Sequence, residues 1–292
     1  MVANKQPGNF IPVIWARKVL KSLDNKLVFG GLCNRNYEGE ITGVGSEVRI
    51  NSIGDINTFD YESNTDMPDP QVLTDDQRRL VIDQQKGFNF QIDDIIEFQS
   101  NVDLQNEAIP KATYAIENTI DRSIAYLYQD TPYINMIGTD SSPISLSNPS
   151  DFYPLLIDMR TMHKRRNVPD DGTRCIVMPP EAFGQLLKDT SRFVFPNAPD
   201  MATGVLRNGR LDTVTGYMIY ESNNCIEETV SGHKIYKIMA FYRETISLAM
   251  QIINVETYRM EKRFANAVKG LYVYGTKVVR PETLLTLTAT IN

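Results

Sequence analysis

Alternating apolar and polar positions predict a long β-hairpin in the first third of the chain. Residues 46–53 and 56–61 alternate with a period near two, as half-buried strands do, and residues 80–82 and 88–92 form a matching return. Between them, residues 62–77 form a sixteen-residue connection with no Lys or Arg. Tight hairpins are joined by about two to five residues, and a two-stranded ribbon is marginal alone in water. We therefore expect another molecule to stabilise this arm, which indicates assembly.

An apolar repeat at three- and four-residue steps predicts one long helix after the hairpin. The helix is expected over residues 93–129, with Ile116, Ile120 and Ile124 on its apolar stripe. Pro110 either kinks this helix or begins a second one. A continuous helix would be on the order of 50 Å long at about 1.5 Å per residue, which suits a flat, elongated subunit.

Alternating helix and strand patterns predict a second α/β unit beyond a polar loop at residues 131–149. Its expected elements are a helix over 151–168, a buried strand over 174–178, a helix over 180–187, and strands over 213–220 and 234–240. Residues 243–250 fit a helix or a strand equally well. The chain is expected to end in long strands that cover the long helix, over residues 256–260, 268–279 and 284–291.

Composition narrows the class of protein. The chain has 292 residues, a net charge of −6 and a pI near 5.1, which argues against a dedicated nucleic-acid binder. Its three cysteines have neither disulfide nor zinc spacing, which favours a reducing compartment. No apolar run reaches the length of a membrane span, and residues 1–9 do not resemble a signal peptide. We expect a soluble protein made in a cytoplasm, with no membrane partner.

Candidate active-site chemistry is weak throughout. The only histidines, His163 and His233, have no ligand-spaced Cys or carboxylates, so we predict no catalytic, cofactor or metal site. His163 is expected to be a cation at a helix end. Lys164, Arg165 and Arg166 fit the same helix end better than a nucleic-acid contact. A two-domain hydrolase is the enzyme alternative, and the missing nucleophile and phosphate-loop motifs weigh against it.

An ordered set of short segments along nearly the whole chain carries a family resemblance. The set comprises Ile14-Trp15, residues 36–39, 45–50 and 88–94, the helix through 118–121, residues 209–223 and residues 270–281. Together they resemble the major capsid proteins of tailed bacteriophages, which have the Hong Kong 97-type capsid fold. No single segment is diagnostic; the order of the set is.

The resemblance implies an α+β fold of five regions. They are an N-terminal arm with short helices (1–38), an extended β-hairpin loop (39–92), the spine helix and linker of a peripheral domain (93–140), an axial domain (141–244), and the closing strands of the peripheral domain (245–292). In the family, axial domains meet around five- and six-fold axes. Each extended loop lies across the peripheral domain of a neighbour.

The implied function is self-assembly, as hexamers and pentamers, into the icosahedral shell of a tailed bacteriophage around double-stranded DNA, which the shell contacts non-specifically. The first family element begins near Phe10, which leaves no room for a scaffolding segment. The resemblance therefore implies a separate scaffolding protein, together with a portal protein. Assembly is expected in the host bacterial cytoplasm, and the product is the virion capsid. The alternative within this fold is an encapsulin-like bacterial compartment shell that encloses cargo protein.

Charge patterning suggests how copies touch. The acidic group of the hairpin connection includes Asp66, Asp69, Asp75 and Asp76, followed by Arg78 and Arg79. Residues 259–280 carry six bases against one acid, and the first three bases are Arg259, Lys262 and Arg263. A solvated surface patch is the simpler interpretation of the acidic run. The alternative hypothesis is that the acidic connection of one subunit docks on the basic closing strands of the next, which would fix register and partner choice.

Overall fold

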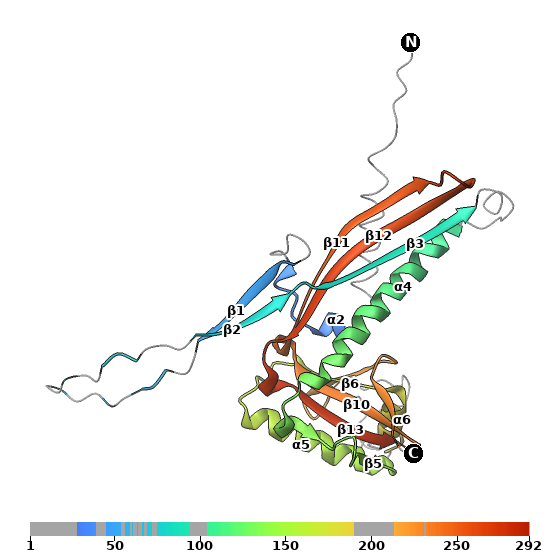
Figure 1. Cartoon of the computed structure of the whole chain (residues 1–292). Coiled ribbons are helices and arrows are strands. Elements are labelled where there is room, and N and C mark those ends of the chain that lie inside the picture. The colour runs from blue at the N-terminus through green and yellow to red at the C-terminus, as the bar shows by residue number, and fades with distance from the viewer. Residues whose placement is uncertain are drawn as a thin grey trace, which may run out of the picture.

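The chain forms two β-sheet units and a projecting two-stranded ribbon, arranged as an elongated molecule (Figure 1). The computed structural model describes residues 28–38, 45–53, 56–58, 60, 63, 66, 69–71, 75–93, 104–189, 213–230 and 232–291. Of the N-terminal arm with short helices expected over residues 1–38, residues 1–27 lie outside these described residues. The described chain begins with the short helix α2 (Phe29–Leu32).

The larger sheet has eight strands in the order β4-β13-β10-β6-β8-β7, with β5 paired to β13 and β9 paired to β10. The strands are β4 (Met136–Ile137), β5 (Ile144–Leu146), β6 (Arg174–Met178), β7 (Thr213–Val214), β8 (Tyr217–Glu221), β9 (Glu227–Val230), β10 (His233–Tyr242) and β13 (Leu285–Ile291). Helices α5 (Phe152–Arg165) and α6 (Pro180–Lys188) pack on one face through Leu156, Met159 and Leu186. The structure confirms the predicted strand over 174–178 and both predicted helices.

The smaller sheet is built from β11 (Ile246–Arg259), β12 (Ala265–Val278) and β3 (Gln84–Asp93), with β12 in the centre. Residues 243–250, which fitted either structure, divide into a single turn, η5 (Arg243–Thr245), and the start of β11. Gly270 of β12 lies under the ring of Phe88, where a Cβ would be 2.2 Å from the ring. The missing side chain therefore lets an aromatic residue of β3 lie flat across its neighbour strand.

Helix α4 (Leu104–Ala125) lies against the smaller sheet. Its isoleucines at 116, 120 and 124 are buried in the main core together with Phe29 and Leu248, as the predicted stripe requires. Its 22 residues span about 33 Å. The helix predicted over 93–129 is therefore shorter at its C-terminal end, where the single turn η2 (Tyr126–Asp130) takes over. Pro110 lies inside α4, so no second helix begins there.

The projecting ribbon consists of β1 (Glu47–Ile53) and β2 (Asp75–Val81), paired antiparallel from Glu47↔Val81 to Ile53↔Asp75. We predicted that the hairpin continues to Ile92. Instead β3 pairs with β12, because its aromatic side chains pack on the smaller sheet. The described residues of the predicted strand over 56–61 are not in a strand either.

The end of the chain departs from the prediction. We expected residues 284–291 to cover the long helix with the other closing strands. In the structure β13 pairs with β10 in the larger sheet, and Leu285, Leu287 and Ala289 are fully buried under α5 and α6. The alternation of Leu and Thr shows that one face of the strand is apolar but not which core it faces. The larger sheet therefore takes its strand next to β10 from the C-terminus.

Three chain crossings join the two sheets, and single helical turns mark each one. They are η3 (Tyr133–Asn135) after η2, η5 between β10 and β11, and η6 (Pro281–Thr283) between β12 and β13; a further turn, η4 (Pro149–Asp151), precedes α5. The buried Asn135 Nδ2 lies 3.0 Å from Pro281 O, 3.1 Å from Glu282 O and 2.9 Å from Leu284 O. Thr245 and Thr283 join hydroxyl to hydroxyl at 2.7 Å. Buried polar contacts thus fix one sheet relative to the other.

Candidate subunit interface

The apolar contacts that the described residues of the ribbon make with the body lie at its base. Val48, Leu80 and Ile82 are buried against Ala249 and Val273 of the smaller sheet. Close backbone approach completes the anchor: a Cβ on Gly275 of β12 would lie 2.3 Å from the carbonyl oxygen of Val81, so only glycine fits there. Beyond this base the two strands extend away from both sheets (Figure 1). A two-stranded ribbon that leaves its body is marginal alone, so this geometry favours support by a partner.

The charges along the ribbon are partly used within the chain. Glu47 receives Arg49 at 3.2 Å and Arg79 at 3.4 Å, both across exposed surface. Arg79 is therefore engaged on its own ribbon, and Arg78 is half-buried on β2. Exposed pairs of this kind contribute about 0–1 kcal/mol each.

The predicted acidic group divides into two parts. Asp66 and Asp69 are exposed in the connection. Asp75 and Asp76 begin β2, opposite Ile53 and Ser52, at the end of the ribbon farthest from its base. The predicted connection over 62–77 is thus wrong at its second boundary, since the paired strand starts at Asp75. Ladder pairing with β1 outweighs the low strand propensity of aspartate there.

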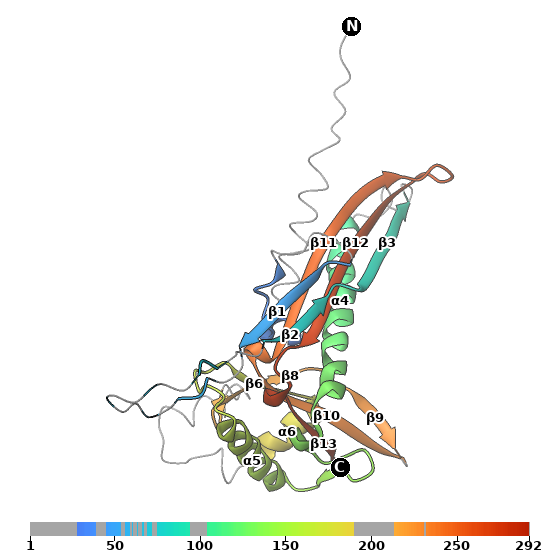
Figure 2. The same ribbon diagram turned by 60° about the vertical axis from the view of Figure 1, so that its left-hand side comes forward.

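Of the six bases in the predicted basic group, three lie at the turn between β11 and β12 and are not in the ion pairs that engage the other three. Arg259, Lys262 and Arg263 are exposed there, and Arg259 donates to the side-chain oxygen of Asn266 at 3.1 Å. The other three bases are held in ion pairs within the chain: Lys269 with Glu256 at 3.0 Å, Lys277 with Asp130 at 3.6 Å and Arg280 with Glu244 at 3.2 Å. This turn lies at the far end of the smaller sheet from the ribbon (Figures 1 and 2). The structure therefore does not bring the two charged groups together within one copy.

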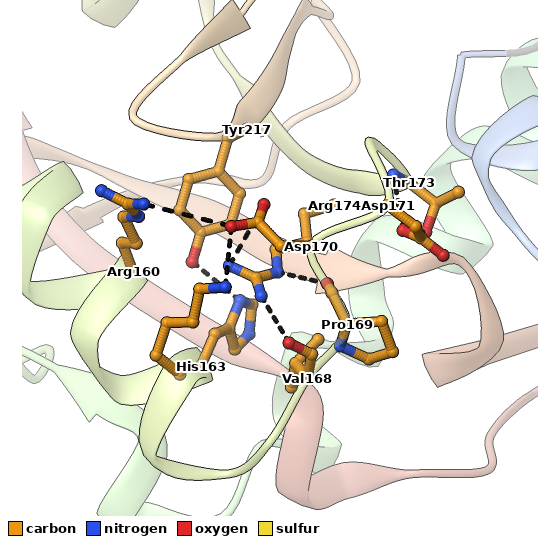
Figure 3. A network of polar contacts seen from close by, with 10 residues as sticks. Arg160, His163, Val168, Pro169, Asp170, Asp171, Thr173, Arg174 and Tyr217 are labelled. Carbon is orange, nitrogen blue, oxygen red and sulfur yellow. Dashed lines mark hydrogen bonds and ion pairs between the residues drawn. The ribbon is translucent and has the colours of Figure 1, made fainter.

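A polar network lies under the last turns of α5 (Figure 3). His163 is fully buried, with Nε2 2.9 Å from Thr283 O and Nδ1 2.7 Å from the hydroxyl of Tyr217. Because a carbonyl can only accept, Nε2 carries the proton, and Tyr217 donates to Nδ1. Burial lowers the pKa of His163 to about 4. The predicted helix-end cation is therefore wrong: His163 is neutral near pH 7 and part of the core.

Asp170 forms ion pairs with three positively charged side chains of the same network. Its carboxylate lies 2.7 Å from Lys164 Nζ, 4.0 Å from Arg160 and 3.9 Å from Arg174 (Figure 3). The hydrogen bond from Lys164, then the charge of Arg174, hold the pKa of Asp170 below its usual range. Arg174 is itself buried, and its Nε donates to Pro169 O at 2.7 Å. Lys164 is thus engaged within the chain, as the helix-end interpretation predicted.

Sequence reasoning did not identify Asn135 or Arg174 as structural centres, although both are fully buried. The signal for Arg174 was a charge at the first position of an apolar strand run, and for Asn135 there was none. Phe264 was missed too; it is a single aromatic residue within a charged turn, and it is 80% exposed.

Features of other classes of site are weak in the described part of the chain. No group of three or more His, Cys, Asp or Glu residues there could hold a metal ion. Among the same residues, no helix is long and apolar enough to cross a membrane. Cys33, Cys175 and Cys225 are free thiols and buried. Burial raises the pKa of Cys225 to about 12 and the pKa of the other two thiols as well, so none has the depressed pKa of a nucleophile.

Known proteins share this architecture. A chain of Mycobacterium phage Che8 is 26% identical with a TM-score of 0.72, over 98% of this chain and 94% of the phage chain. The capsid of cyanophage P-SCSP1u is 15% identical with a TM-score of 0.72, over 100% and 93%. The SrpI encapsulin of Synechococcus elongatus is less similar, 13% identical with a TM-score of 0.52, over 98% and 91%. No curated protein matches the chain in sequence.

The predicted α+β fold is confirmed as the Hong Kong 97-type capsid fold, which these phage capsid structures share. A family model described as phage capsid protein matches residues 78–287, from β2 to β13. The chain therefore belongs to the family of phage capsid proteins, which assemble into multi-subunit shells.

Proposed function

We propose that this protein is the major capsid protein whose hexamers and pentamers build the icosahedral shell of a tailed phage around double-stranded DNA. The observation that carries the proposal is the ribbon of β1 and β2, which packs on its own body through its base and projects from it (Figure 1). Contacts with neighbouring copies would stabilise a subunit of this shape, because each copy both extends an arm and receives the arm of another. Modest contacts then sum over many neighbours.

The charged residues suggest which surface of the next copy binds the arm, that is, the ribbon of β1 and β2 with its connection. We retain the hypothesis that its acidic part docks on the basic turn of the next copy, now restricted to Arg259, Lys262 and Arg263. On the arm, Asp66 and Asp69 are exposed, and Asp75 and Asp76 stand at the far end of the ribbon. Arg78 and Arg79 remain on the ribbon side of this contact, with Arg79 bound to Glu47. Exposed charges contribute register and partner choice more than affinity.

A charge-swap experiment tests this contact. Replacing Asp66 and Asp69 with Lys, or the three turn bases with Glu, should impair shell assembly without unfolding the subunit. Combining both sets in one chain should restore assembly, because every copy supplies an arm and a turn. Asp158→Lys, at an exposed position of α5, is the matched control. The contact would be contradicted if neither the Lys substitutions nor the Glu substitutions changed shell assembly. It would also be contradicted if the combined variant assembled no better than the variants that carry one set alone.

The remaining partners follow from a phage shell. We propose a separate scaffolding protein, a portal protein and non-specific contact with packaged DNA, with assembly in the host bacterial cytoplasm. The net charge of −6 suits a wall that faces DNA without binding it strongly. Purified particles from infected cells should then protect double-stranded DNA from nuclease. Particles that enclose an enzyme and no DNA would indicate the encapsulin-like alternative, and the lower similarity to the encapsulin disfavours it. A capsid family also supports a structural, non-enzymatic role.

A further inference from the structure

The turn between β11 and β12 presents a large apolar side chain to solvent. Phe264 is 80% exposed, more than any other phenylalanine, leucine or methionine of the described residues. Its neighbour Ala265 is buried, and the amide of Met260 donates to Ala265 O at 3.1 Å, which closes the turn. The backbone is thus held by the sheet while the ring points away from it. Because this backbone is already ordered, a partner that covers Phe264 has only the rotamers of the side chain to fix.

The surroundings of Phe264 match the composition of a binding hot spot. Aromatic residues and arginine are enriched at such sites, usually at the centre of a polar rim. Here the exposed bases Arg259, Lys262 and Arg263 flank Phe264 in the sequence, with the single acid Glu261. The partner surface should therefore offer an apolar residue flanked by carboxylates.

The connection between β1 and β2 in the structure, residues 54–74, contains exposed residues of both kinds. Ile56 there is 69% exposed, and the acids Asp66 and Asp69 of the same connection are exposed as well. In both views the ribbon lies beside the base of the smaller sheet, and the β11–β12 turn lies at the other end of that sheet (Figures 1 and 2). One copy cannot bring them together, so their complementary charges point to a second copy.

We propose that Phe264 is the apolar anchor of the contact between subunits, and that it packs against Ile56 in the arm of a second copy. The inference rests on the proposed shell function and adds a residue to it. Phe264 supplies affinity for the neighbouring copy, whereas the charged residues determine the register of the contact. Such a contact is head-to-tail, since each copy uses one surface to give and another to receive, and it forms a closed ring where the rotation between copies closes.

Cysteine labelling tests the burial of Phe264, and the chain provides a low background because its three native thiols are buried. Phe264→Cys should react with a maleimide in the free subunit, and react at least about tenfold more slowly in assembled shells. Urea-unfolded protein gives the full extent of labelling. Equal rates in subunit and shell would overturn the anchor. Since the side chain is so exposed, this variant should fold like the wild type.

A disulfide tests the partner. The double variant Ile56→Cys with Phe264→Cys should yield covalent multimers when shells are oxidised, because a disulfide requires Cα atoms within about 7 Å. Ile56→Cys with Asp158→Cys, an exposed position of α5, should stay monomeric on a denaturing gel. Multimers from Phe264→Cys alone would show that two turns meet, and protection without any disulfide to Ile56 would also contradict the assigned partner.

Assembly thresholds separate this inference from the shell function itself. Phe264→Ser should raise the subunit concentration needed for assembly by about tenfold or more, because it removes most of a buried aromatic side chain. Phe264→Leu should stay within about threefold of the wild type. If wild-type protein forms shells and Phe264→Ser assembles equally well, the anchor is wrong and the shell function stands. If wild-type protein forms no shells at all, the proposed function fails first.

Discussion

Replacing His163 should remove a pH-dependent part of the stability of the subunit. The imidazole is buried between α5, β8 and η6, where Thr283 O and the hydroxyl of Tyr217 occupy both ring nitrogens. Burial is the largest cause of the lowered pKa, and the positive charges of Arg174 and Arg166 lower it further. A second proton would need an acceptor at Nδ1, where Tyr217 now donates. The folded protein therefore resists protonation that the unfolded chain accepts.

The magnitude follows from the two pKa values. The pKa falls from 6.5 in the unfolded chain to about 4 in the folded protein, and each pKa unit corresponds to about 1.4 kcal/mol, so the difference is about 3 kcal/mol. Between these values the unfolded state binds more protons than the folded state, so stability falls as the pH falls. The stabilisation is complete above pH 6.5, decreases down to about pH 4 and is then level.

Urea unfolding of the purified subunit between pH 7 and pH 4 measures the effect. The free energy of unfolding of the wild type, minus that of His163→Gln, should decrease by about 3 kcal/mol as the pH falls from 7 to 4. Other titrating groups are present in both proteins and cancel in this difference. His233→Gln, which replaces the other histidine at an exposed position, is the matched control substitution. A difference between wild type and His163→Gln that does not change with pH would refute the reasoning.

Two further predictions concern packing. Asn135→Ala should lower the free energy of unfolding by about 1–3 kcal/mol, because it removes the buried amide that the carbonyls of Pro281, Glu282 and Leu284 share, of which Pro281 O also accepts from the backbone N–H of Leu284; unchanged urea midpoints would contradict this. Gly275→Ala should destabilise the subunit more than Gly270→Ala, since its new Cβ would meet the rigid carbonyl of Val81 and not the ring of Phe88, which can turn. Each change is expected to cost about 1–3 kcal/mol or more, and thermal unfolding that ranks the two in reverse would argue against it.

Local patterns predicted the elements whose own apolar residues determine how they pack. The isoleucine stripe of α4 and the helices α5 and α6 lie where apolar spacing placed them, each with one face in a core. The continuous apolar run of β6 predicted a buried strand, and in the structure its residues alternate between the two cores.

The pairing of strands was not predictable in the same way. β3 and β13 alternate like any half-buried strand, and the pattern does not say which of two sheets each will join. We predicted β3 in the ribbon, and it pairs with β12; we predicted β13 over the long helix, and it pairs with β10. The local pattern fits either pairing equally well, so long-range packing decides between them. The buried state of His163 was missed for a similar reason: its partners Tyr217 and Thr283 are 54 and 120 residues away.

For the proposed contact surfaces between subunits, the sequence predicted the charged residues and the loops that carry them, but no apolar residue. An acidic connection and a basic turn are visible in the sequence, and the structure shows which members are exposed and which are engaged in ion pairs within the chain. The apolar partner of those charges, Phe264, gives no periodic signal because it belongs to no strand or helix face.

Electron microscopy of the purified protein tests the central claim most directly. At concentrations above the assembly threshold, with a scaffolding partner supplied where one is needed, the protein should form closed icosahedral shells or their capsomers, with the ribbon of each copy lying across the smaller sheet of a neighbour. A stable monomer that forms neither shells nor capsomers under any condition, or shells in which the ribbon touches no neighbour, would contradict the account.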